Sequence, residues 1–185
     1  MKTKPNIVLT EEHEYFVDGV RYASVTEVLQ EVGAYGRAAD YYTEKSRIRG
    51  TYVHKIIEYH LSGTLDEDSI DQRLRGYYDA WRRFEEENRF TIERVEEPIC
   101  NAPLMLAGTP DIIGRSDLPR FPTPIILDIK TGEQPPATKL QLAGYKVILG
   151  ITAALYKRTA VQLRKNGTYS FWRYDNDEKD RDTFL

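Results

Sequence analysis

Asp128 and Lys130 are a pair of residues whose types and spacing could do chemistry. They lie two apart at the end of an apolar run that begins at Pro124. Because alternate residues of a strand point to one face, their carboxylate and ammonium groups would project together. Burying such charges is costly unless they are paired or bind a metal. Alone, the pair fits an ion pair at a strand end as well as a catalytic site.

A second carboxylate strengthens the catalytic interpretation. Asp111 follows Gly108-Thr109-Pro110 and begins another apolar stretch, which we expect to be a neighbouring strand. Two acids on adjacent strands can converge on one divalent cation, and Mg²⁺ prefers carboxylate, carbonyl and water oxygens. The backbone carbonyl of Ile129 could add such an oxygen. A nearby lysine can hold the attacking water or offset charge in the transition state. Asp111, Asp128 and Lys130 together therefore predict phosphodiester hydrolysis.

Two further pairs share a helix face, because residues four apart on a helix are neighbours. Gln141 and Tyr145 form one pair, and His54 and Glu58 form the other, shortly after Arg49. By itself, Gln141 fits a surface residue, Tyr145 a core residue and His54 a structural hydrogen-bonding group. Their meaning depends on the order of the motifs along the chain.

Four motifs occur in one order between residues 49 and 145. They are Arg49-Gly50-x-x-x-His54, Gly108-Thr109-Pro110-Asp111, Asp128-Ile129-Lys130 and Gln141-x-x-x-Tyr145. Each is short, but together they resemble the PD-(D/E)XK nuclease superfamily, in particular its RecB-like exonuclease branch. The opening segment, residues 15–29, is similar to the start of small phage-type and mitochondrial-type members.

The resemblance implies a role for each motif residue. The implied metal ligands are His54, Asp111, Asp128 and the carbonyl of Ile129. The implied catalytic residues are Asp111, Asp128, Lys130, Gln141 and Tyr145. Glu97 falls where some relatives supply a further acid, and Glu96 would point to the other face of the same strand. We therefore expect Glu97, rather than Glu96, to face the site. Candidate DNA contacts are Arg49, Lys55, Lys139 and Tyr145.

The activity implied is a Mg²⁺- or Mn²⁺-dependent exonuclease that acts from DNA ends, on single strands, in recombination, repair or replication. A structure-selective endonuclease on the same core and a non-catalytic DNA-binding recombination accessory are the alternatives. The expected partner is DNA, and a recombination or replication protein and an oligomeric assembly are compatible with the motifs. Relatives with an iron–sulfur cluster use four cysteines, and the single Cys100 excludes that group. The P-loop motif of ATPases is also missing from the sequence. A helicase motor that works with this protein would therefore be a separate chain.

Composition is consistent with such an enzyme. The 185 residues are 41% hydrophobic and 30% charged, with a formal net charge of −3. This size and composition predict one domain over residues 1–185. No apolar run approaches the roughly 20 residues of a membrane span, and residues 1–5 lack a signal-peptide pattern. We therefore expect a cytoplasmic protein, bacterial or in a phage-infected cell, without a membrane partner.

The expected elements place the motifs on helices and strands. Asp18-Gly19 and Asn166-Gly167 are typical hairpin turns, and Ser24 and Glu27 form a capping-box pattern that begins a helix. The other expected helices are 37–62 with a break at Gly50, 68–88 and 138–149. The other expected strands are 91–99, 104–114, 124–130, 154–163 and 168–174.

This order predicts a mixed α/β or α+β fold. Residues 1–90 would form a hairpin and a mainly helical part, and residues 91–175 the catalytic sheet and the motif helix. The resemblance implies a restriction-endonuclease-like core, with a central mixed β-sheet flanked by helices.

Overall fold

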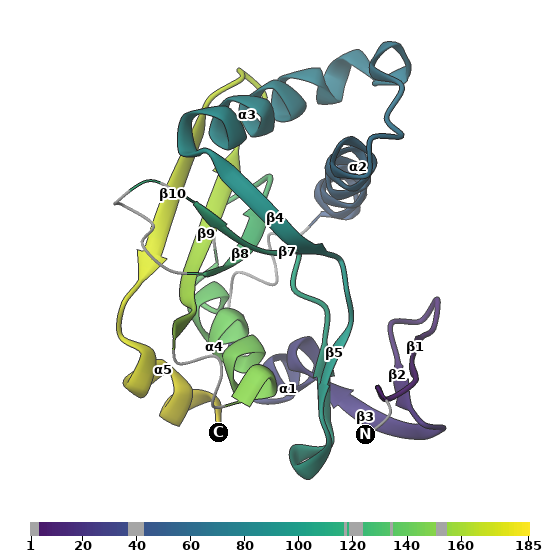
Figure 1. The fold of residues 1–185 in the computed structure, drawn as a ribbon, viewed down its shortest axis with the longest axis vertical. Helices are drawn as coiled ribbons and strands as arrows, with labels where there is room; N and C mark the ends of the chain where they lie inside the picture. Colours follow the sequence, from purple (N-terminus) through teal and green to yellow (C-terminus); the bar gives the residue numbers. More distant parts are fainter. Residues whose placement is uncertain (1–3, 37–42, 117, 119–123, 134, 151–154) are drawn as a thin grey trace.

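The chain forms a mixed α/β structure in which helices pack against two five-stranded sheets (Figure 1). The computed structural model describes residues 4–36, 43–116, 118, 124–133, 135–150 and 155–185. The strands are β1 (Ile7–Leu9), β2 (Tyr15–Val17), β3 (Val20–Ser24), β4 (Phe90–Val95), β5 (Ile99–Asn101), β6 (Leu106–Gly108), β7 (Ile112–Ser116), β8 (Ile125–Lys130), β9 (Lys157–Leu163) and β10 (Tyr169–Tyr174). The helices are α1 (Val25–Glu31), α2 (Glu44–Leu61), α3 (Gln72–Asn88), α4 (Thr138–Leu149) and α5 (Asp177–Phe184), with short 3-10 turns at Glu67–Ser69 and Ala102–Leu104.

One sheet has the strand order β10-β9-β8-β7-β4. Its middle strand, β8, runs parallel to β9 and antiparallel to β7. Every residue of β8 except Lys130 is buried. The prediction of a central strand buried on both faces is therefore confirmed, and the sheet is mixed, as expected.

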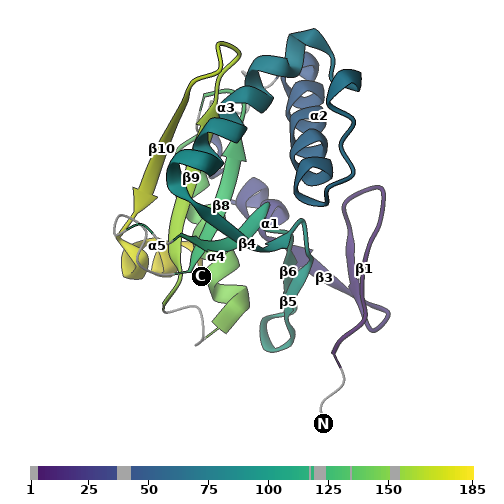
Figure 2. The ribbon, with the colours of Figure 1, turned by 45° about the horizontal axis from the view of Figure 1, so that its top comes forward.

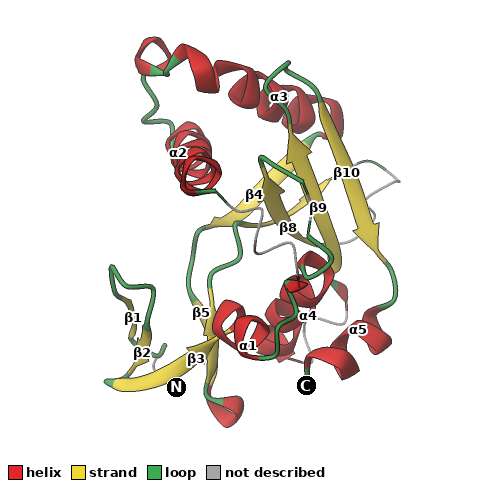
Figure 3. Ribbon diagram, turned by 180° about the vertical axis from the view of Figure 1, so that it is seen from behind, coloured by secondary structure: helices red, strands yellow, loops and turns green. Residues whose placement is uncertain are grey.

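The two faces of β8 contribute to two different cores. Ile125, Leu127 and Ile129 pack with α2 and α3, whereas Ile126 packs with α4. Seen from behind, the strands lie between α3 on one side and α4 with α5 on the other (Figure 3). By the same alternation, Asp128 belongs to the α4 face of the sheet. The motif strand and the motif helix are thus brought face to face.

The other sheet has the order β1-β2-β3-β6-β5, with β3 parallel to β6. The turn at Asp18 and Gly19 joins β2 to β3, and both residues have positive φ. Ser24 then caps α1, and Glu27 completes the capping box. These predictions are confirmed. The sheet brings β6, which leads into Asp111, next to the first helix.

Three sequence expectations about elements are wrong. The expected strands 91–99 and 104–114 each split between the two sheets, as β4 and β5 and as β6 and β7. Pro98 and Pro110 lie at the two breaks, where a residue without an N–H cannot continue a strand ladder. Helix α2 passes through Gly50 without the expected break. The charged C-terminal segment, for which the sequence predicted no element, forms α5.

Two expected elements extend beyond the described residues. The part of the expected helix at 37–42 and the start of the expected strand at 154 lie outside them. Figure 2 shows α2 beside α3 at one end of the molecule. Across the described ranges, no helix is both long and apolar enough to cross a bilayer.

Candidate metal centre

The four motifs meet where both sheets approach α2 and α4. His54 lies in the middle of α2, and Asp111 lies directly before β7. Asp128 and Lys130 lie at the end of β8. Gln141 and Tyr145 lie on α4, which packs against the same strand. Residues separated by up to 91 positions in the sequence, from His54 to Tyr145, are thereby gathered into one region.

His54 lies at the centre of a group of possible metal ligands. Its Nδ1 is 3.3 Å from Glu96 Oε1 and 3.7 Å from Asp111 Oδ1. Its Nε2 is 3.0 Å from the carbonyl oxygen of Ile129. The Ile129 N–H in turn donates to Asp111 Oδ2 at 2.6 Å. The ligand atoms of His54, Glu96 and Asp111 all lie within 4.8 Å of one another.

The acid beside His54 is Glu96, not the expected Glu97. Glu96 has a φ of 46°, and its N–H donates to the carbonyl of Asp111 at 2.9 Å. Glu97 forms an exposed ion pair with Lys4 at 2.8 Å instead. The expectation assumed regular strand alternation, but β4 ends at Val95 and the left-handed backbone at Glu96 reverses which side chain faces the site. The adjacency of the two acids was the only signal in the sequence.

Asp128 is 1% exposed and is only partly paired. Lys130 Nζ donates to Asp128 Oδ1 at 2.9 Å and approaches Gln141 Oε1 at 3.4 Å. Gln141 Nε2 donates to the Tyr145 hydroxyl at 3.1 Å. The other carboxylate oxygen, Asp128 Oδ2, is buried and has no hydrogen-bond partner among the described residues. Such an oxygen is costly unless something else binds it.

Burial and crowded charges shift the pKa values in this group. Burial raises the pKa of Asp128 to about 6, with a further rise from Asp111 and an opposing effect from Lys130. Burial also raises the pKa of Asp111. For His54, burial lowers the pKa, but the charge of Asp111 and the contacts with Glu96 outweigh it and raise the pKa to about 9. The three carboxylates of this group, Glu96, Asp111 and Asp128, therefore outnumber its two cationic groups, His54 and Lys130.

These properties fit a divalent cation. Carboxylate oxygens and a backbone carbonyl suit Mg²⁺ and Mn²⁺, whereas an imidazole is a more usual ligand of metals such as Zn²⁺ and Fe²⁺. A bound cation would pair with the unpartnered oxygen of Asp128. It would also lower the raised pKa values of the two aspartates. His54, Glu96 and Asp111 are the side chains whose ligand atoms converge closely enough to hold such an ion, and Asp128, beside Lys130, is not a member of that group.

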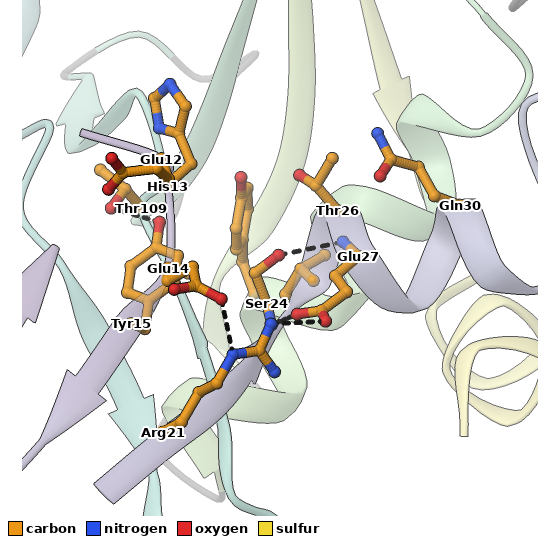
Figure 4. A pocket seen from close by; sticks show the side chains of 13 residues that line it. Glu12, His13, Glu14, Tyr15, Arg21, Ser24, Thr26, Glu27, Gln30 and Thr109 are labelled. Atoms are coloured by element: carbon orange, nitrogen blue, oxygen red, sulfur yellow. Dashed lines mark hydrogen bonds and ion pairs between the residues drawn. The ribbon is translucent and has the colours of Figure 1, made fainter. Parts of the chain in front are cut away.

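A cavity of about 580 Å³ opens beside this centre. Gly108, Thr109 and Tyr145 belong to its lining, and the Tyr15 hydroxyl points to Thr109 at 2.8 Å (Figure 4). A Cβ on Gly108 would lie 2.8 Å from the Tyr145 ring, so the glycine permits the close approach of α4. Across the cavity, an arginine lies between two glutamates (Figure 4), and these residues are Arg21, Glu14 and Glu27.

The expected DNA contacts are spread around the centre. Arg49 Nε approaches Thr131 Oγ1 at 3.4 Å, directly after the motif strand. Lys55 is exposed on α2. Lys139 lies at the start of α4 and is 4.0 Å from Asp180 of α5. Of these, Arg49 is the residue that the fold brings next to the motif strand.

Comparison with known proteins does not assign the chain to a family. No protein-family model matches the sequence, and no curated protein matches it.

Proposed function

We propose that this chain is a divalent-metal-dependent deoxyribonuclease with a restriction-endonuclease-like core of the PD-(D/E)XK type. The observation that carries the proposal is the buried Asp128, whose second oxygen lacks a partner among the described residues. It lies beside a lysine and close to a cluster of three possible ligands, His54, Glu96 and Asp111. Ion pairing alone would explain Asp128 Oδ1 with Lys130 and His54 with its two acids, but it leaves Asp128 Oδ2 without a partner among the described residues.

A bound Mg²⁺ or Mn²⁺ would supply Lewis-acid stabilisation of phosphate charge and would make water more acidic. The chain's own residues would hold the ion and position the reacting groups. His54, Glu96 and Asp111 would be the direct ligands, with the carbonyl of Ile129 and Asp128 Oδ2 as further oxygens. The pairing of the Ile129 N–H with Asp111 fixes that carboxylate relative to the motif strand.

Lys130 is the proposed catalytic cation. Its ammonium group would orient the attacking water and offset the negative charge that develops on the phosphate. Asp128 and Gln141 accept from Lys130 Nζ, and Tyr145 accepts from the Gln141 amide. Gln141 and Tyr145 thus restrict where the ammonium group can lie, which is the role of a positioning pair.

The substrate we propose is DNA with a free end, hydrolysed as a single strand. The four-motif pattern favours an exonuclease over its alternatives, the structure-selective endonuclease and the non-catalytic accessory. A covalently closed single-stranded circle separates the first two, because an exonuclease leaves it intact.

The test is hydrolysis of end-labelled single-stranded DNA with Mg²⁺ or Mn²⁺ by the wild type and by Lys130→Ala. We expect cleavage by the wild type and a loss of at least about 100-fold in the variant, as for removal of one charge-stabilising donor. Lys179→Ala, at an exposed position of α5, is the matched control. Wild type that does not cleave, or a Lys130→Ala variant that cleaves normally, would overturn the proposal.

A further inference from the structure

The outward face of α2 carries a continuous stripe of aromatic, aliphatic and basic side chains. Its members are Lys45, Ile48, Tyr52, Lys55 and Tyr59, which we call the tyrosine–lysine stripe. Successive members are three or four residues apart, so they are neighbours along one side of the helix. The buried residues of α2, Val53 and Ile57, lie on the opposite side. The stripe therefore faces away from the core.

The large side chains of the stripe are about half exposed. Tyr52 is 58% exposed, Tyr59 is 47% exposed and Ile48 is 46% exposed. Among the described residues, their side chains and those of the two lysines make no hydrogen bond or ion pair. A cluster of exposed apolar side chains at regular spacing is typical of a surface that binds something.

The charge of α2 indicates what kind of partner fits. The helix has four lysines and arginines against two glutamates, Glu44 and Glu58, although the whole chain has a net charge of −3. Helix α2 thus has an excess of two positive charges in a protein that is acidic as a whole. Such local charge attracts a polyanion, whereas an apolar partner protein has no need of it.

Aromatic rings alternating with lysines suit single-stranded nucleic acid in particular. Bases stack on exposed aromatic rings regardless of sequence, and lysines contact the phosphates between them. Tyr52 and Tyr59 are two helical turns apart, about 10 Å along the axis. Lys55 lies between them. In double-stranded DNA the bases are stacked on each other and could not use these rings.

We propose that the tyrosine–lysine stripe binds single-stranded DNA by stacking bases on Tyr52 and Tyr59. This inference rests on the proposed function for its biological meaning, since His54 of the metal centre lies on the same helix. The flank of α2 between His54 and the stripe carries the exposed Arg47 and Thr51, together with the half-buried Glu58. A helix is only about 10–12 Å across, so a few nucleotides span that flank. The stripe would hold the strand near the site of hydrolysis.

The test uses binding of fluorescent strands to the full chain in EDTA, so that no metal is required. The probes are an oligothymidylate and an abasic strand of the same length, which has the phosphates but no bases. We expect the wild type to prefer the oligothymidylate. Tyr52→Ala/Tyr59→Ala should bind it roughly tenfold or more weakly and should bind the abasic strand normally. Tyr52→Phe/Tyr59→Phe keeps the rings and should retain the preference.

Two further variants separate charge from stacking. Lys45→Gln/Lys55→Gln should lower the slope of log affinity against log salt by about 1.4, the value for two phosphate contacts on a single strand. Trp172→Ala, at an aromatic residue on β10 that is 38% exposed, is the control and should bind like the wild type.

The inference is overturned if the double alanine variant binds the oligothymidylate normally. It is equally overturned if that variant loses the same affinity for the oligothymidylate and for the abasic strand. It is also overturned if that variant only converts a wild-type dimer to a monomer, because a second copy would then be the occupant. Hydrolysis of bis(p-nitrophenyl) phosphate with Mn²⁺ by the wild type tests the metal centre separately. Stacking-dependent binding without hydrolysis contradicts the proposed function alone, and hydrolysis without such binding contradicts this inference alone.

Discussion

Replacing Glu96 by glutamine tests whether this acid is a metal ligand. The glutamine keeps the size of the side chain and removes its charge. In the metal-free protein, Glu96 lies beside His54 and Asp111 and helps to raise the pKa of Asp111. The substitution removes this repulsion and also the attraction between Glu96 and protonated His54, so the two effects oppose each other and metal-free stability should change little. If Glu96 instead serves mainly to hold the metal-free fold together, Glu96→Gln should clearly destabilise the metal-free protein.

With metal present, Glu96→Gln should be clearly less stable than the wild type. Groups that only orient a ligand typically contribute 10–100-fold to metal affinity, so a direct ligand should contribute at least that much. This loss corresponds to about 1.4–2.7 kcal/mol of metal-linked stability. For a chain of this size, each kcal/mol changes Tm by roughly 2–4 °C. Saturating Mn²⁺ should therefore raise the Tm of Glu96→Gln by about 3–11 °C less than that of the wild type.

The assay is thermal unfolding at several Mn²⁺ concentrations, with isothermal calorimetry for the affinity. Glu97→Gln is the matched control, because its ion pair with Lys4 is exposed and such pairs contribute little. It should respond to Mn²⁺ like the wild type. If Glu96→Gln and Glu97→Gln respond alike, or if only Glu97→Gln loses the response, the assignment of Glu96 is refuted.

Three further predictions concern stability and metal removal. Arg158→Met leaves the carboxylates of Asp177 and Asp180 without their buried partner, and urea unfolding should show a loss of about 3–5 kcal/mol. A change below about 1 kcal/mol would mean that α5 is not held by this arginine. Gly76→Ala places a Cβ 1.8 Å from the carbonyl oxygen of Lys165 and should cost about 1–3 kcal/mol, whereas unaltered stability would contradict the packing of α3 on the β9–β10 turn. EDTA should abolish DNA hydrolysis while circular dichroism remains native, since both cores are apolar, and unfolding by EDTA would instead show that the metal is structural.

Local sequence signals predicted most elements correctly. The Asp18-Gly19 and Asn166-Gly167 hairpins form with the expected strand pairs, and α4 covers the expected residues 138–149 and ends before Gly150. The helix expected at 68–88 forms as α3, and its Trp81 is fully buried in the core. These features depend on turn chemistry and periodicity, which are local properties.

What the sequence could not provide depends on contacts between distant residues. The division of the expected strands between two sheets follows from Pro98 and Pro110, yet nothing local says which sheet receives each half. The choice of Glu96 over Glu97 depends on one positive φ angle. Arg158 on β9 is fully buried because it pairs with Asp177 and Asp180 of a helix that the charged C-terminal sequence did not suggest.

The most direct measurement of the central claim is anomalous X-ray diffraction from a crystal grown with Mn²⁺. The account predicts a manganese peak within coordination distance, about 2.0–2.5 Å, of His54, Glu96 and Asp111. Asp128 Oδ2 should become a ligand of the ion or of its water. A well-ordered crystal saturated with Mn²⁺ but without a peak there, or with manganese only at surface carboxylates elsewhere, would contradict the account.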